Sequence, residues 1–466
     1  MNKILYVYAK GGAPLDHILP RVAGCGELHM LALMPLPDTG AERWRPYCAS
    51  IAETHAGGVR GEAAVDEIVR RAKAVGADAV MTLSEFAVLA VAHAADLLGL
   101  AGAGATAAEK ARDKRLMRES WAAAGVPIPG FRRVSTEADL RAALTELTPP
   151  VLLKPAWGAG SIAQLVLHSP DDVSSAWAQV APALDKGNQV GMSELYETEA
   201  DRHLLVEEIV TGSVDGWYDV PGYADYVSVE GIVADGVYHP LCIAARLPPI
   251  PPFNEVASLM PCVLPEPLQR VVEEVSRQAV DALGLGTCGT HTELKLRAGG
   301  VPAVIETGAR FGGVMITKQI EEVFGLDPIA MLTRQLLGER VVYPERMLVE
   351  GHGAAASVVA VPADSAGNPW RSTPPWQPRA VDWPAILSPG SAIEAVAAFD
   401  RPIGEAIPAY DPAAGVANWL GVFMLTAADA GTLLRDCNAV LDGLEDGLNR
   451  ASERRVSGRT ASPGGR

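Results

Sequence analysis

Short apolar runs alternate with amphipathic stretches along the first hundred residues. The apolar runs are typical of buried strands, and they cover residues 3–9, 29–35 and 77–85. The amphipathic or apolar stretches between them have the length and periodicity of helices, at 62–76 and 86–100. Strands that alternate with helices predict a parallel α/β sheet, which we place in an N-terminal domain of residues 1–106.

The pattern changes beyond residue 106. A basic amphipathic stretch at 107–127 predicts one helix, and 149–168 predicts two strands joined by a Gly/Ser loop. The segment 226–247 alternates well around an Asp235-Gly236 pair, which predicts a hairpin. Further helices are expected at 171–184, 266–283 and 316–337, and a strand is expected at 203–212.

The composition becomes richer in Pro, Gly and Trp after residue 351. A strand at 418–426 and a helix at 427–450 complete a small C-terminal α+β domain, expected over 351–450. The polar segment 451–466 has the composition of a disordered tail.

One predicted hairpin places two carboxylates directly opposite each other on neighbouring strands. In HTELKLRAGGVPAVIETGAR, a turn at Gly299-Gly300 predicts that Leu294 faces Ile305 and that Glu293 faces Glu306. Directly opposed like charges are unfavourable unless something positive lies between them. Paired hard oxygen ligands suit Mg²⁺. The alternative is a solvated sheet face that carries salt bridges.

Charge and composition narrow the classes of function. The net charge of −17 argues against nucleic-acid binding through the overall field of the protein. No run of about 20 apolar residues is present, so we expect no membrane span. The six cysteines show neither CxxC nor zinc spacing, and we interpret them as reduced thiols of a cytoplasmic protein.

Two further motifs could bind a nucleotide. In KPAWGAGS, Lys154 ends an apolar strand, and Gly158, Gly160 and Ser161 follow in a loop whose backbone N–H groups could converge on phosphate. A plain hairpin loop is the alternative. In LLVEEIVTG, two acids end an apolar strand, which suits an exocyclic amino group or an exposed strand end.

These motifs occur in one order, and together they resemble the ATP-grasp superfamily. The resemblance is strongest to carboxylate–amine ligases of the L-amino acid ligase (bacilysin synthetase) type, over residues 77 to about 345. It rests on TLSEFAVLAVAHAADLLGLAG, ARDKRLMRESWAAAGVPIP, LLKPAWGAGS, LVEEIV and HTELKL…VIETGARFGG. It implies an α/β (α+β) ATP-grasp fold, in which a two-part core at 107–350 follows the N-terminal domain. A mobile lid is expected at about 130–210.

The resemblance also implies a role for each matching residue. Lys114, Lys154 and the loop Gly158, Gly160 and Ser161 would contact ATP phosphates, while Glu207, Glu208 and Ile209 would contact adenine and Asp225 the ribose. Glu293 and Glu306 would hold Mg²⁺, with Mn²⁺ as a substitute. Arg310 would face the γ-phosphate and the substrate carboxylate, beside a substrate pocket formed with Glu255, His291 and Gly313.

The implied reaction joins a small-molecule carboxylate to an amine, such as a second amino acid, through an acylphosphate. Two alternatives remain: an ATP-grasp carboxylase that uses bicarbonate, and a non-catalytic nucleotide-binding protein. A homodimer is left open. Two departures from the family pattern stand out: Gly308 occupies a position that is usually asparagine, and the segment 213–225 is longer than expected.

Overall fold

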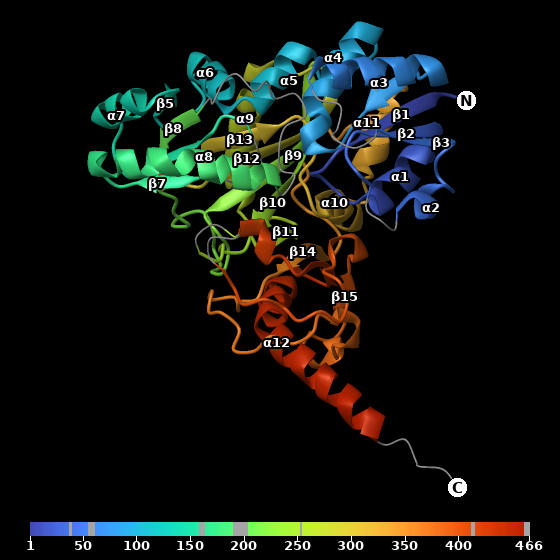
Figure 1. Cartoon of the computed structure of the whole chain (residues 1–466), viewed down its shortest axis with the longest axis vertical. Coiled ribbons are helices and arrows are strands. Elements are labelled where there is room, and N and C mark those ends of the chain that lie inside the picture. The colour runs from blue at the N-terminus through green and yellow to red at the C-terminus, as the bar shows by residue number, and fades with distance from the viewer. Residues whose placement is uncertain are drawn as a thin grey trace.

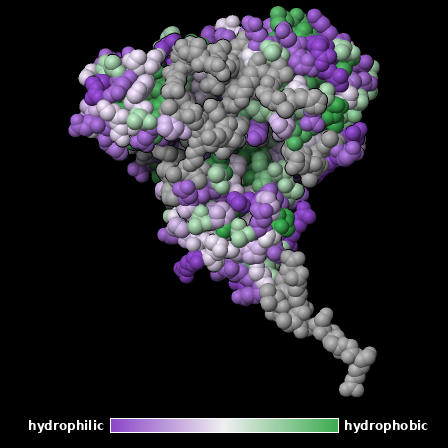
Figure 2. Space-filling view, viewed as in Figure 1, coloured by the Kyte–Doolittle hydropathy of each residue, from purple (hydrophilic) through white to green (hydrophobic). Residues whose placement is uncertain are grey.

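The computed structural model describes residues 1–36, 40–54, 61–157, 164–189, 204–251, 254–411 and 415–460. The chain forms a broad upper body, and its C-terminal part forms a narrower lower projection that ends in α12 (Figure 1). Hydrophilic side chains predominate among the coloured atoms of the visible face, and hydrophobic ones show in the hollowed middle and at the upper right (Figure 2). No helix in the described ranges is both long and apolar enough to cross a membrane.

The N-terminal segment forms the predicted parallel sheet. Its strand order is β3 (Ser50–Glu53), β2 (Glu27–Ala32), β1 (Lys3–Tyr8) and β4 (Ala79–Met81), and every pairing is parallel. The strands are continuous apolar runs because helices pack against the sheet. These helices include α1 (Leu15–Ala23), α3 (Glu62–Val75) and α4 (Val88–Leu98), and the short α2 (Gly40–Trp44) lies between β2 and β3.

A second, antiparallel sheet lies within the segment expected to form the lid. Its order is β5 (Phe131–Val134), β8 (Leu204–Glu208), β6 (Val151–Pro155) and β7 (Leu165–Leu167). Helices α7 (Glu137–Glu146) and α8 (Val173–Gln189) contact this sheet and each other, and the whole group lies at one side of the upper body in Figure 1.

The third sheet has eight strands and runs from the upper body into the lower projection (Figure 1). Its order is β13 (Ala303–Gly308), β12 (Cys288–Lys295), β9 (Tyr226–Ala234), β10 (Val237–Arg246), β11 (Ala257–Met260), β14 (Ala354–Ala360), β16 (Gly421–Ala427) and β15 (Ala392–Ala395). The predicted β9–β10 hairpin is confirmed. Asp235 and Gly236 both have positive φ, at 50° and 81°, as a tight hairpin turn requires.

The remaining helices pack around this sheet. They are α5 (Ala105–Arg112), α6 (Lys114–Ala124), α9 (Glu266–Leu283), α10 (Ile316–Phe324), α11 (Pro328–Leu336) and α12 (Ala430–Thr460). The bounds of α9 match the prediction, whereas α12 continues to Thr460, past the expected end at residue 450. All six cysteines are free thiols.

The prediction of one helix over 107–127 is wrong. Asp113 has extended backbone angles, with φ −91° and ψ 107°, and its side chain accepts the N–H of Arg115 at 2.8 Å. An aspartate that caps a new helix in this way ends the preceding one. The chain therefore forms α5, which ends at Arg112, and then α6, which begins at Lys114.

The two faces of the eight-stranded sheet differ in character. Side chains alternate along a strand, so Val227 and Val229 of β9 lie in the apolar core under α9, while Ser228 and Glu230 point to the opposite face. Trp121 of α6 is fully buried against α9, and its indole N–H donates to the Ala279 carbonyl at 2.9 Å. The polar side chains therefore gather on one face of a sheet whose other face is core.

We expect Trp121→Ala to lower the free energy of unfolding by about 3–5 kcal/mol, because it removes a large buried ring and leaves a cavity. Denaturant melts monitored by circular dichroism would measure the loss. Leu97→Ala is the matched control, because Leu97 is 69% exposed. Equal stability of the two variants would contradict the placement of α6 against α9.

Candidate active site

The β12–β13 hairpin places two carboxylates on one rung of the large sheet. Glu293 pairs directly with Glu306, which confirms the predicted pair. The prediction that Leu294 faces Ile305 is wrong: a β-bulge follows Glu293, so Leu294 faces Val304. The bulge changes only the pairs between Glu293 and the turn. The cross-strand pair of Glu293 with Glu306, called the carboxylate rung below, is retained.

Lys114 reaches this rung from the first turn of α6. Its Nζ lies 3.3 Å from the Glu306 carboxylate, and its side chain is only 9% exposed. Burial alone would raise the pKa of Glu306, but the positive charges of Lys114, Lys154 and Arg112 outweigh it and lower that pKa to about 2. Glu306 is therefore ionised at neutral pH.

Lys154 and Glu207 form a buried ion pair between β6 and β8. Arg118 of α6 shares the carboxylate, with Nε donating at 3.1 Å, and all three side chains are almost fully buried. Burial opposes ionisation of Glu207, but the charges of Arg118 and Lys154 hold its pKa below the ordinary value. Arg118 was not singled out from the sequence, although its i, i+4 spacing from Lys114 puts both cations on one helix face.

His291 connects the rung to a second buried acid. Its Nδ1 lies 2.5 Å from Glu230, which is fully buried on β9, and its Nε2 lies 3.2 Å from Glu293. The other oxygen of Glu230 accepts the backbone N–H of Gly312 at 2.9 Å. Sequence reasoning missed Glu230, although an acid inside the apolar run YVSVEGIVA is a usable signal.

Arg310 follows β13 and contacts a carboxylate that sequence reasoning also missed. Glu85, in the short 3₁₀ helix η1 (Glu85–Ala87), contacts both Arg310 and Arg112. Arg310 also donates from Nη1 to the Phe311 carbonyl at 2.7 Å. Glu306, Glu230 and Glu293 all favour the charged form of Arg310, although burial lowers its pKa. These residues therefore form one electrostatic cluster.

The residues expected to contact adenine and ribose lie near the small sheet and the start of β9. The Glu208 carboxylate accepts the backbone N–H of Thr148 at 2.9 Å, and the Ile209 N–H donates to the Pro150 carbonyl at 3.2 Å. Asp225 is paired with Lys295 at 2.7 Å. The Glu208 carboxylate and the Ile209 N–H are thus occupied within the protein.

Glu255 and Gly313, both expected at the substrate pocket, contact different parts of the chain. Glu255 is half exposed and lies 3.6 Å from Nε of Arg246. Gly313 lies against Gly12, since a Cβ at Gly313 would stand 3.9 Å from the Gly12 Cα. Gly158, Gly160 and Ser161 of the predicted phosphate loop lie outside the described residues.

The donor set fits a divalent cation that arrives with phosphate. The described residues contain no group of three or more His, Cys, Asp or Glu side chains that would enclose a metal ion by themselves. Mg²⁺ characteristically takes one or two carboxylates and completes its shell with phosphate oxygens and water. Glu293 and Glu306 supply two such carboxylates on one rung.

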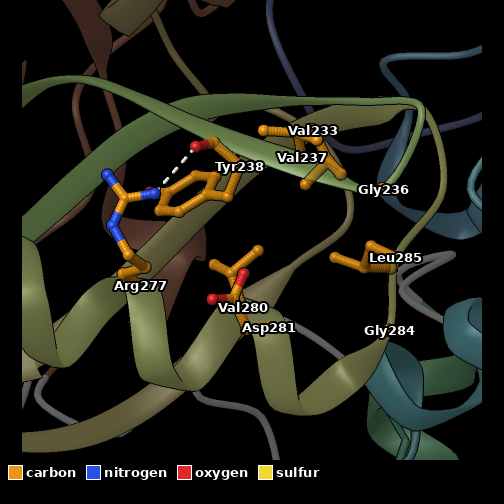
Figure 3. Close-up of a pocket in the computed structure, with 9 residues that line it drawn as sticks. All are labelled: Val233, Gly236, Val237, Tyr238, Arg277, Val280, Asp281, Gly284 and Leu285. Carbon is orange, nitrogen blue, oxygen red and sulfur yellow. Dashed lines mark hydrogen bonds between the residues drawn. The ribbon is translucent and has the colours of Figure 1, made fainter. Parts of the chain in front are cut away.

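A surface hollow of about 310 Å³ lies elsewhere, between the β9–β10 turn and the C-terminal half of α9 (Figure 3). Its lining includes Val233, Tyr238, Arg277 and Asp281, and Arg277 donates to the Tyr238 carbonyl at 2.9 Å. Val233 and Glu230 point to opposite faces of β9 because side chains alternate along a strand. The hollow therefore does not open onto the carboxylate cluster.

Several curated proteins similar to this chain are named as ligases. Alanine–anticapsin ligase of Bacillus subtilis (strain 168) is 38% identical over 288 residues, which are 62% of this chain and 60% of that protein. The L-arginine-specific L-amino acid ligase of Bacillus subtilis is 24% identical over 255 residues, 53% of this chain and 55% of that protein. The chain thus spans about 60% of the length of the alanine–anticapsin ligase it matches. No family model matches it.

Solved structures share the fold over nearly the whole chain. The L-amino acid ligase from Bacillus licheniformis superposes with a TM-score of 0.69 at 20% identity, over 96% of this chain and 98% of that chain. The biotin carboxylase domain of the Hydrogenobacter thermophilus 2-oxoglutarate carboxylase gives a TM-score of 0.65 at 16% identity, over 98% of both chains. The chain therefore has the ATP-grasp fold, and the curated proteins similar to it include an alanine–anticapsin ligase and an L-amino acid ligase.

Proposed function

We propose that this protein is an ATP-dependent carboxylate–amine ligase that forms an amide bond and releases ADP and phosphate. The observation that carries the proposal is the Glu293–Glu306 rung, with Lys114, Lys154 and Arg310 gathered around it. Paired carboxylates beside converging cations suit a metal–nucleotide complex in which phosphoryl charge must be neutralised. The named relatives are ligases, which supports the same class of reaction for this chain.

The nucleotide would lie between the small antiparallel sheet and the large sheet. Lys114 and Lys154 would contact the phosphates together with Gly158, Gly160 and Ser161. Glu207 with Glu208 and Ile209 would border the adenine, through groups other than the Glu208 carboxylate and the Ile209 N–H. Asp225 would reach the ribose once it leaves Lys295. Residues 130–210 would act as a lid that closes over the nucleotide and excludes water.

The first chemical step would create an acylphosphate. A carboxylate oxygen of the first substrate attacks the γ-phosphorus of ATP, the bond from that phosphorus to the bridging oxygen breaks, and ADP leaves. Arg310 would orient the carboxylate and offset charge on the transferred phosphoryl group, while Lys154 would hold the phosphates. Glu293 and Glu306 would hold Mg²⁺ or Mn²⁺, which supplies further neutralisation of phosphate charge when bound.

The second step would form the amide. The amine attacks the acyl carbon, the carbon–oxygen bond to phosphate breaks, and the amine nitrogen loses a proton. Glu255 and His291 would border the amino groups of the substrates, and Gly313 would leave room for a side chain. Both substrates would be small molecules, with an amino acid as the carboxylate component. The closed lid would protect the acylphosphate from hydrolysis.

The decisive experiment measures ADP and phosphate release with Mg-ATP against amino acids offered singly and in pairs. We expect release that requires a pair of substrates, together with a condensed product whose mass equals the sum of both less one water. Release that instead depends on bicarbonate would assign a carboxylase. ATP binding without release under every mixture would assign a non-catalytic nucleotide-binding protein.

We expect Glu293→Gln and Glu306→Gln each to lower the rate of ADP release by about 100-fold or more, because each removes a charged metal ligand beside the reacting phosphate. Titration of Mg²⁺ should show weaker activation in both variants. Glu274→Gln, an exposed acid on α9, serves as the control. Wild-type activity in both hairpin variants would remove the metal assignment.

We expect Lys154→Met to weaken ATP and ADP binding by roughly 10-fold or more, because a charge-assisted contact to phosphate is lost. Arg118 would still neutralise Glu207, so the fold should survive. Calorimetric titration would measure the affinity, and Lys73→Met, an exposed lysine on α3, is the matched control. Equal affinity of the two variants would contradict the phosphate role of Lys154.

A further inference from the structure

Glu85 belongs to the N-terminal part of the chain, yet it contacts cations of the candidate active site. Its side chain is 3% exposed and touches Arg112, at the end of α5, and Arg310, which follows β13. These residues come from three segments far apart in the sequence. Arg112 is itself only 1% exposed, whereas Arg310 is 15% exposed. The open side of the cluster is therefore at Arg310.

The surrounding backbone fixes Glu85 in place. Its N–H donates to the Gly11 carbonyl at 3.1 Å, and a Cβ at Gly11 would stand 2.6 Å from the Glu85 Cβ. A Cβ at Gly12 would stand 2.1 Å from the Leu83 carbonyl oxygen. Both glycines also have positive φ, at 82° and 112°. The Gly11-Gly12 pair therefore lets the loop after β1 press directly against the Glu85 segment.

Two contacts orient the Arg310 guanidinium. Nε is directed at the Glu85 carboxylate, and Nη1 donates to the Phe311 carbonyl at 2.7 Å. These two contacts use Nε and Nη1 and do not involve Nη2. Because Nε and Nη1 lie on different edges of the planar group, these two contacts together fix its orientation and so the direction of Nη2.

We propose that Glu85 is a positioning residue that anchors Arg310 so that its remaining donors face the reacting carboxylate and phosphate. Glu85 touches neither substrate nor nucleotide and acts only through Arg310. The catalytic part of this inference rests on the proposed ligase function, while the anchoring itself does not. The N-terminal part of the chain thereby contributes directly to the order of the active site.

A double-mutant comparison separates positioning from simple charge balance. Wild-type Glu85, Arg112 and Arg310 carry a net charge of +1, and Glu85→Gln combined with Arg112→Met retains that charge with Arg310 alone. If Glu85 positions Arg310, adding Glu85→Gln to Arg112→Met lowers kcat for ADP release by about 100-fold. The Kd for ADP should change little, because Lys114 and Lys154 are intact. An unchanged kcat in the double variant relative to Arg112→Met would overturn the proposal.

Glu321→Gln is the matched control. It removes an ion pair with Arg21 that also joins the N-terminal part to the core, but it touches no residue of the cluster. We expect its kcat to equal that of the wild type. A loss as large as that from Glu85→Gln would mean that any weakening of this junction slows the enzyme, and the specific role of Glu85 would fail.

A crystal structure of Glu85→Gln tests the anchoring without any turnover. We expect the Arg310 guanidinium to leave its wild-type position in Glu85→Gln and to keep it in Glu321→Gln. An unmoved Arg310 in Glu85→Gln would overturn the positioning role. If the wild-type protein releases no ADP with any substrate pair, the ligase function fails, and this structural comparison still decides whether Glu85 anchors Arg310.

Discussion

Electrostatic repulsion between Glu293 and Glu306 is the constraint on which the candidate active site depends. Two ionised carboxylates on one sheet rung repel each other, and partial burial strengthens the repulsion. Cations from several elements offset this repulsion. They are Lys114 of α6, Lys154 of β6 and Arg310, which follows β13. Each of these cations is itself buried or nearly so, and therefore needs an acid of its own.

This requirement explains why the cluster contains acids that have no direct part in the proposed phosphoryl transfer. Lys154 is paired with Glu207, and Arg310 is paired with Glu85. Breaking one such pair costs stability unless another member of the cluster compensates the remaining charge, as Arg118 does for Glu207. Each of the three cations is therefore paired with an acid. The members of this network come from the N-terminal part, the small antiparallel sheet and the large sheet.

The sequence predicts the local parts of this arrangement well. The β9–β10 turn, the bounds of α9 and the Glu293–Glu306 rung follow from turn residues and periodicity, because short-range geometry determines them. The errors also have local causes. Asp113 satisfies a helix N-terminus and so divides a stretch whose periodicity looks continuous, and a bulge after Glu293 shifts the rungs nearer the turn.

The residues that sequence reasoning missed act through contacts between distant segments. Glu85 meets Arg310 across 225 positions of sequence, and Glu230 meets His291 across 61. No spacing rule reports such pairs, since they arise only when separate sheets pack together. The usable signal is an acid inside an apolar run, as in TLSEF and YVSVEGIVA, because a buried acid needs a partner.

Packing does not explain why Gly308 stands where the resemblance leads us to expect an asparagine. A Cβ built there would meet nothing closer than 3.8 Å, where it approaches Cζ of Arg310. Packing therefore does not impose glycine at this position, and a side chain could begin there without displacing its neighbours. Compared with the asparagine that the resemblance leads us to expect there, glycine lacks a side-chain oxygen beside the carboxylate rung. Water can complete the shell of a magnesium ion, so a rung of two carboxylates is compatible with the proposed nucleotide-bound cation.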